Sequence, residues 1–236
     1  IFDITYDEMK ELCDLAKTKH TFFLEGLKTR FVPMANVIKE TVDKGTIGKV
    51  LRVENSFCYE CPYIEGKYLF DEKQGGILYD VGTYNIGTLY DYIDSEVTHI
   101  HIHCEKKYGV DAYDEVEITF ASGQSAKIEI ALDRKKERLM TIYGEYGKIT
   151  CDPFYRPVSG TVEFDNGESF SATKDYVYDD FFGEIEETHR CVGYLYNESP
   201  RYTHEHMCKT IALIEKIREM IDHGESDWDN GIDSGR

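Results

Sequence analysis

The chain has 236 residues, of which 41% are hydrophobic, and a formal net charge of -18. Its length suffices for one large domain, or for one domain with an additional segment, and the negative charge argues against nucleic-acid and membrane partners. Seven cysteines, an odd number without the spacing of a secreted disulfide scaffold, favour a reducing, cytoplasmic location.

The N-terminal part predicts two helices and a strand. Apolar residues recur with a helical period over residues 5–18, where Thr5 and Glu8 have the spacing of a capping box. The largely apolar run 20–24 predicts a short strand of the kind buried in parallel sheets. A second helix is predicted over residues 33–44, with a proline in its first turn and a glycine after its end.

The centre of the chain predicts a mainly antiparallel sheet. Apart from a helix over residues 80–92, apolar residues alternate with polar ones, and turn sequences such as Asp-Asn-Gly at 165–167 predict hairpins. The predicted strands are residues 49–59, 97–104, 113–120, 125–132, 137–143, 147–151, 160–164 and 168–172.

Two helices are predicted to close the chain, over residues 181–195 and 204–221. The tail at 223–236 is rich in Gly, Asp and Ser and is predicted to be flexible. Helices laid on one face of a large, mainly antiparallel sheet define an α+β architecture.

Residues 74–84 combine two glycines, an acid and a phenol. Asp80 and Tyr84 are four residues apart, so on a helix both side chains lie on one face and can converge on one substrate. Gly75 and Gly76 allow close approach to a ligand or a sharp turn, and we predict that they bind substrate. The alternative is a glycine turn before a helix that Asp80 caps.

Four further motifs accompany this segment: Arg30-Phe31-Val32-Pro33, Gly45-Thr46-Ile47-Gly48-Lys49-Val50, Gly109-Val110-Asp111-Ala112-Tyr113-Asp114 and Gly144-Glu145-Tyr146-Gly147-Lys148-Ile149. In this order, the five motifs resemble the C-terminal part of the Gfo/Idh/MocA oxidoreductases, over nearly the whole chain. The resemblance implies a C-terminal domain like that of glyceraldehyde-3-phosphate dehydrogenase.

Members of this family begin with a dinucleotide-binding Rossmann domain, followed by Glu-Lys-Pro. Neither Glu-Lys-Pro nor a glycine-rich phosphate loop after a strand occurs in this sequence. The resemblance therefore implies that residues 1–26 are a remnant helix and strand of that domain, residues 27–222 the substrate and oligomerisation domain, and residues 223–236 a tail.

The resemblance implies that the full-length parent is an NAD- or NADP-dependent oxidoreductase acting on a sugar, polyol or cyclic diol. The fragment by itself is expected to be inactive and to bind no dinucleotide tightly. A homodimer or higher homo-oligomer is expected to form through the sheet. A non-catalytic ligand sensor and an oligomerisation module of the same family remain alternatives.

The resemblance also assigns site residues. Asp80 matches an aspartate that bonds substrate hydroxyls and orients the base. Tyr84 stands where many members carry His, and because a phenol has a pKa near 10 we expect a hydrogen-bond donor or proton relay. Arg30 matches an arginine at the domain junction and is predicted to approach the substrate or the cofactor, with a surface salt bridge as the alternative. Lys73 and Tyr68 precede the glycines and are candidates to line the cleft.

No metal site is predicted. His99, His101 and His103 alternate along one strand and share a face, but successive positions are about 6–7 Å apart, too far for all three to bind one ion. We expect them on an exposed or interfacial sheet face. Cys58 and Cys61 have the spacing of a redox or zinc pair, without a second pair in the sequence.

Overall fold

The structure is a computed structural model that describes residues 5–231. Its helices are α1 (Tyr6–Lys19), α2 (Pro33–Asp43), α3 (Ile77–Leu89), α4 (Phe182–Gly193) and α5 (His204–His223), with short 3-10 turns η1 (Lys28–Arg30) and η2 (Tyr68–Phe70). Its strands are β1 (Val50–Cys58), β2 (Val97–Lys107), β3 (Val110–Phe120), β4 (Ser125–Ala131), β5 (Met140–Gly144), β6 (Gly147–Cys151), β7 (Ser159–Phe164), β8 (Ser169–Thr173) and β9 (Asp227–Asp229).

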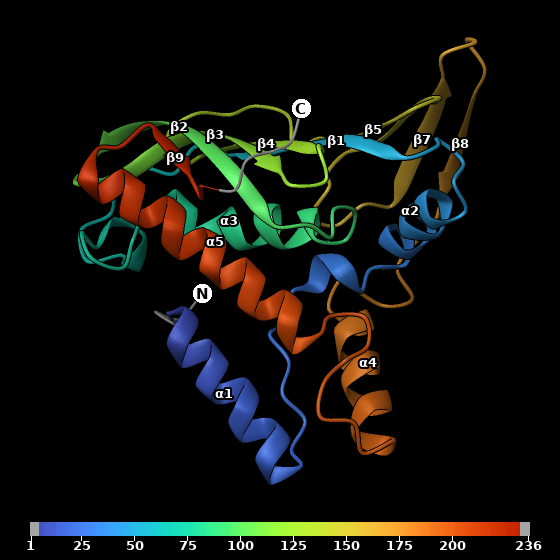
Figure 1. The fold of residues 1–236 in the computed structure, drawn as a ribbon, viewed down its shortest axis with the longest axis horizontal. Coiled ribbons are helices and arrows are strands. Elements are labelled where there is room, and N and C mark those ends of the chain that lie inside the picture. Colours follow the sequence, from blue (N-terminus) through green and yellow to red (C-terminus); the bar gives the residue numbers. More distant parts are fainter. Residues whose placement is uncertain (1–4, 232–236) are drawn as a thin grey trace.

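These strands form one sheet in the order β8-β7-β6-β5-β1-β4-β3-β2-β9. The pair β1–β4 is parallel and the other neighbouring pairs of the described sheet are antiparallel. Figure 1 shows α3 and α5 beneath one face of the sheet, α2 beneath its β7 side, and α1 and α4 farther away. The predicted α+β class, with helices on one face of a mainly antiparallel sheet, is confirmed.

Helix α3 lies between the sheet and α5, and most of its residues are buried. Two buried amides fix it on the sheet: Asn55 of β1 donates to the Asn85 carbonyl at 3.0 Å, and the Asn85 amide donates back to Asn55 at 2.7 Å. A buried polar pair of this kind favours one rotation of the helix, because any other would leave the side-chain amide N–H groups of both residues without these acceptors. Asp80 and Tyr84 remain half-buried at the margin of α3.

The N-terminal helix α1 has the predicted capping box between Thr5 and Glu8. The predicted strand at 20–24 is wrong. This segment is extended, but its backbone bonds lead to α1 and to the loop before α5, where Phe23 N–H donates to the Asn197 carbonyl at 3.0 Å. An apolar extended run becomes a strand only beside another strand, and none runs alongside it in residues 5–231.

The prediction of a flexible tail is wrong for the short strand β9. Asp227–Asp229 pairs with the edge strand β2, placing Trp228 opposite Ile100, and Lys216 of α5 lies 5.3 Å from the centre of the indole ring. A single apolar residue between two acids is too short a pattern to predict a strand. The predicted tail residues 232–236 lie outside the described residues.

Several element boundaries also differ from prediction, most notably those of β5 and α3. The strand expected at 137–143 begins at Met140, and the helix expected from Asp80 begins at Ile77. Helix α3 starts earlier because the Asp111 carboxylate accepts from Leu78 N–H at 2.9 Å, which satisfies an amide of the first turn.

Within residues 5–231, no helix has the length and apolarity needed to cross a membrane.

The sheet face away from the helices is polar and carries neighbouring charges of both signs. Ion pairs across it join Arg52 to Glu54 at 2.6 Å and Lys127 to Glu115 at 3.0 Å. The three alternating histidines of β2 lie on this face, where His99 and His101 face carboxylates of β9 at 2.9 and 2.8 Å. The prediction of a shared sheet face for these histidines is confirmed.

Candidate active site at the start of α3

Asp80 and Tyr84 line one cavity of about 350 Å³, between α3, α5, α1 and the extended segment 23–27. The prediction that both side chains share one face of a helix is therefore confirmed, while their catalytic role stays a prediction. The residues that line the cavity are Met9, Phe23, Leu24, Glu25, Gly26, Leu27, Asp80, Thr83, Tyr84 and Ile211.

The Asp80 carboxylate accepts hydrogen bonds from two phenols. Tyr59, just past the end of β1, donates to Oδ2 at 2.5 Å, and Tyr68 of η2 donates to Oδ1 at 2.5 Å. The bond to Asp80 is the main cause that raises the pKa of Tyr68 to about 12, while burial chiefly raises that of Tyr59. Asp80 does not act as the N-cap of α3, a position that Gly76 occupies.

Sequence reasoning placed Tyr68 beside the site but did not identify Tyr59. Only the alternation of β1 offered a signal, since Asn55, Phe57 and Tyr59 fall on the helix-facing side of that strand. A tyrosine at the end of such a strand projects toward whatever helix covers it.

Tyr84 has no hydrogen-bond partner for its hydroxyl among residues 5–231, and its ring lies 6.2 Å from that of Phe57. Burial, followed by the negative charges of Glu184 and Asp80, raises the pKa of Tyr84 above its usual value of 10. A phenol in these surroundings stays protonated at neutral pH. Tyr84 is therefore suited to donate a hydrogen bond or a proton, and unsuited to act as the resting base.

Two further acids lie near this phenol. Glu25 accepts from the Tyr202 hydroxyl at 3.1 Å, and burial raises its pKa. Burial also raises the pKa of Glu184, whose Oε2 has no hydrogen-bond partner in the described chain. The cavity thus combines acceptors with one available phenolic donor, an arrangement that suits a hydroxylated, uncharged ligand.

The predicted substrate-binding glycines do not line this cavity. Gly76 has φ +101°, and a Cβ there would lie 1.9 Å from Oδ1 of the buried Asp111. A Cβ on Gly75 would lie 2.6 Å from backbone oxygens of the preceding loop. Packing accounts for both glycines. Lys73 is exposed and its backbone N–H donates to Asp71, so it too lies outside the cavity.

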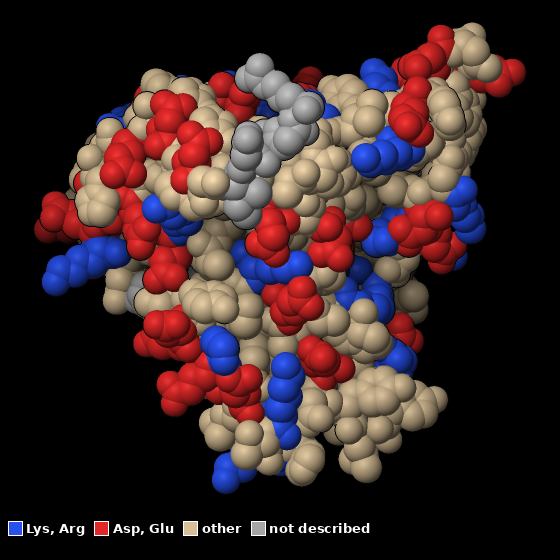
Figure 2. Space-filling model, viewed as in Figure 1, with Lys and Arg blue, Asp and Glu red and all other residues tan. Residues whose placement is uncertain are grey.

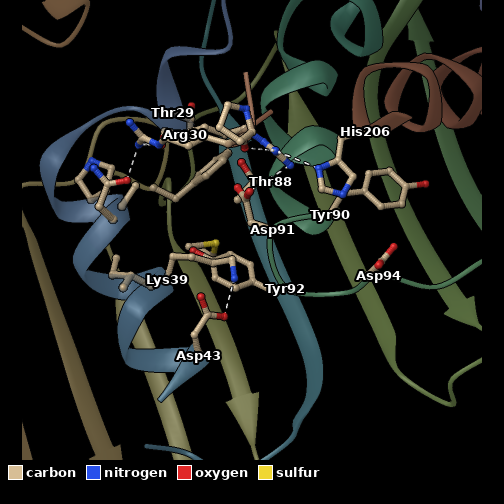
Figure 3. Close-up of a pocket in the computed structure, with 18 residues that line it drawn as sticks. Thr29, Arg30, Lys39, Asp43, Thr88, Tyr90, Asp91, Tyr92, Asp94 and His206 are labelled. Carbon is tan, nitrogen blue, oxygen red and sulfur yellow. Dashed lines mark hydrogen bonds and ion pairs between the residues drawn. The ribbon is translucent and has the colours of Figure 1, made fainter. Parts of the chain in front are cut away.

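The structure places Arg30 in a second cavity, of about 390 Å³, near the other end of α3. Its side chain is 2% exposed, so the alternative of a surface salt bridge is wrong. It pairs with Asp91 at 3.0 Å and donates to the Gly87 carbonyl at 2.9 Å, and Figure 3 shows it pointing toward Asp91 and His206. Arg30 and Asp80 therefore do not share a cavity.

Residues 36–150 match the model of the GFO/IDH/MocA C-terminal domain. Residues 36–150 are thus similar to a GFO/IDH/MocA C-terminal domain. The chain is also 25% identical over 194 residues to D-xylose 1-dehydrogenase (NADP(+)) of Hypocrea jecorina, an alignment that covers 71% of this chain and 49% of that enzyme. The chain thus spans about half the length of the curated relative it matches.

Two solved structures share the fold. The 3-ketoreductase of Actinomadura kijaniata, in complex with NADP and TDP-benzene, has a TM-score of 0.77 at 17% identity and matches over 91% of this chain and 67% of its own. The aldose-aldose oxidoreductase of Caulobacter crescentus, complexed with glycerol, has a TM-score of 0.78 at 15% identity, over 95% of this chain and 69% of its own. The predicted glyceraldehyde-3-phosphate-dehydrogenase-like architecture is confirmed.

Proposed function

We propose that this chain is the C-terminal part of an NAD- or NADP-dependent oxidoreductase that acts on a sugar, a polyol or a cyclic diol. The observation that carries the proposal is the joint presentation of Asp80, an acceptor held by two phenols, and Tyr84, an available donor, on one cavity. The xylose dehydrogenase and the 3-ketoreductase named above support the reaction class and the coenzyme.

In this proposal the coenzyme exchanges a hydride with the carbon that bears the reacting oxygen. Tyr84 donates a hydrogen bond to that oxygen, and Asp80 accepts one from a neighbouring substrate hydroxyl. We assign no residue of this chain to the dinucleotide phosphates, because the sequence contains no glycine-rich phosphate loop after a strand.

In this proposal the chain is divided as the sequence predicts: residues 1–26 belong with a nucleotide-binding domain, and residues 27–222 form the substrate and oligomerisation domain. Association of copies occurs through the helix-free face of the sheet, whose charges of both signs suit self-association. Seven cysteines with free thiols support a reducing, cytoplasmic location.

Titration of the chain with NADH and NADPH tests the assignment of the dinucleotide to another domain. We expect no saturable binding at micromolar concentrations, because the chain presents no phosphate-binding loop. Tight binding by residues 1–236 would contradict this part of the proposal. Light scattering on the same sample reports the oligomeric state. A monomer would contradict the proposal that copies of the chain associate through the helix-free face of the sheet.

Substitutions in the longer protein test the site itself. Tyr84→Phe and Asp80→Asn should each lower kcat/KM by roughly 10²–10⁴, because each removes a hydrogen bond to the reacting centre or its neighbour. Tyr178→Phe, at a tyrosine that is 79% exposed, is the matched control and should leave the rate unchanged. Near-normal rates for both site variants would remove Asp80 and Tyr84 from the mechanism. A longer protein without any oxidoreductase activity would instead favour the alternative of a ligand-sensing or oligomerisation module.

A further inference from the structure

Both oxygens of the Asp80 carboxylate are bonded by phenols that come from two separate segments. Tyr59 is 21 residues before Asp80 and Tyr68 is 12 residues before it, and each O–O distance is 2.5 Å. Hydrogen bonds from a hydroxyl to a carboxylate are among the strong ones in proteins, and they are short for that reason. Two such bonds, one on each oxygen, fix both the position and the plane of the carboxylate.

The two phenols are held by different means. Tyr59 is half-buried, and its N–H donates to the Ala131 carbonyl at the end of β4, so the sheet fixes its backbone. Tyr68 is 64% exposed and begins the turn η2. The last residue of that turn, Phe70, is buried, and its ring centre lies 5.0 Å from that of Tyr63. One donor is thus part of the rigid scaffold and the other lies at the surface of the site.

This arrangement leaves the carboxylate able to accept further hydrogen bonds. A carboxylate offers about four lone-pair positions, and the two phenols occupy one on each oxygen. Asp80 also lines the cavity that contains Tyr84. A ligand hydroxyl in that cavity therefore meets an acceptor that is already oriented, instead of a freely rotating side chain.

Building on the function proposed above, we propose that Tyr59 and Tyr68 are positioning residues, which hold Asp80 as a fixed acceptor for a substrate hydroxyl. Asp80 acts in this arrangement as a hydrogen-bond acceptor throughout the reaction, with no proton transferred to it. The exposed Tyr68 is the member that a bound ligand approaches, while Tyr59 stays covered.

The arrangement itself is testable on the chain without any catalytic assay. Tyrosines labelled with ¹³C at Cζ report ionisation by NMR, and Tyr68→Phe identifies the Tyr68 signal. With Asp80 in place, Tyr68 should remain protonated up to at least pH ~10.5, because the carboxylate raises its pKa to about 12. In Asp80→Asn, the Tyr68 signal should titrate near its ordinary value of about 10. An unmodified chain in which Tyr68 titrates near 10 would overturn the proposal.

The positioning role is tested by kinetics in the longer protein. Tyr59→Phe and Tyr68→Phe should each lower kcat roughly 10-fold or more while the melting temperature of Tyr68→Phe changes little, since its side chain is exposed. Tyr63→Phe is the control, because it alters a phenol of the same loop whose hydroxyl makes no hydrogen bond within residues 5–231. Combined with Asp80→Asn, neither Tyr→Phe change should lower kcat further, since both act through Asp80.

The outcomes separate the two proposals. If Tyr68→Phe matches Tyr63→Phe in kcat, or if its effect adds in full to that of Asp80→Asn, the positioning role is wrong. If Asp80→Asn itself retains a normal rate while the NMR titration behaves as expected, the hydrogen bonds are present but the proposed function of the site fails.

Discussion

Each end of α3 lies beside a cavity lined by polar and charged residues, but the two groups of residues differ in how many of their hydrogen-bonding atoms are already paired. Near its start, Tyr84 has an available hydroxyl on a cavity, and Asp80 keeps acceptor capacity beyond its two phenols. Near its other end, the Arg30 guanidinium bonds the carbonyls of Gly87 and Arg201 and pairs with Asp91. A polar residue in a cavity is a site candidate only if its own partners leave some of its hydrogen-bonding capacity free. By this criterion the start of α3 is the stronger candidate site.

The largest effect on stability is expected from Arg30→Met. It removes the ion pair with Asp91 and the bonds to two carbonyls, and it leaves a mostly buried carboxylate unpaired. Breaking one partner of such a pair costs about 3–5 kcal/mol of unfolding free energy. Urea denaturation of the chain measures the loss.

Arg30→Lys is the matched control for charge. It keeps a cation near Asp91 but not the forked geometry, so we expect a smaller loss than for Met. Should Arg30→Met unfold at the same urea concentration as the unmodified chain, Arg30 would not be a structural residue, and its cavity would regain its place as a substrate-site candidate.

Asp91, which pairs with Arg30, should make the free energy of unfolding depend on pH. Burial raises the pKa of Asp91 to about 6 despite the nearby guanidinium of Arg30. Between the two pKa values the folded state keeps the Asp91 proton and the unfolded chain has lost it. The stabilisation that results is therefore fully present below pH ~4 and is lost as the pH rises through about 6. The shift of about two pKa units corresponds to roughly 2–3 kcal/mol.

Denaturation of the unmodified chain and of Asp91→Asn, at intervals from pH 4 to pH 7, isolates this contribution. The difference in unfolding free energy between the unmodified chain and Asp91→Asn should change by roughly 2–3 kcal/mol from pH 4 to pH 7, with the unmodified chain losing stability relative to the variant. A difference that stays constant with pH would show that Asp91 titrates alike in both states.

The sequence was sufficient for the features that depend on local pattern. The α+β class, the capping box at Thr5 and the shared face of Asp80 and Tyr84 all follow from periodicity and spacing, which a residue carries regardless of its surroundings. Even the polar face that bears the histidines of β2 is a consequence of strand alternation.

Features that depend on distant partners could not be predicted in this way. The segment 20–24 has the composition of a strand but lies beside no other strand, and β9 forms because β2 offers it an unpaired edge. Tyr59 reaches Asp80 across a separation that no local motif spans. The packing role of Gly75 and Gly76 could not be predicted either, because the atoms that leave no room for a Cβ belong to Asp111 and to the preceding loop.

Gly76→Ala tests whether the start of α3 needs its glycine for packing. The backbone there has φ +101°, and the new Cβ would meet the buried Asp111 carboxylate. We expect a loss of about 1–3 kcal/mol in urea denaturation. Gly45→Ala, with φ +71° and no atom within 4 Å of its added Cβ, is the control and should lose less. Equal losses would attribute the whole effect to backbone conformation.

The smallest effect is expected from Lys39→Ala, although Lys39 lines the same cavity as Arg30. Its ammonium pairs with Asp43 at 2.5 Å one turn along α2, and both side chains are largely exposed, at 43% and 56%. Such a pair contributes roughly 0.3–0.5 kcal/mol, and alanine recovers part of that through its higher helix propensity. Urea denaturation should therefore show a change below about 0.5 kcal/mol. A larger loss would mean that the cavity around Arg30 depends on charges at its mouth, and the contrast between the two ends of α3 would then be one of degree.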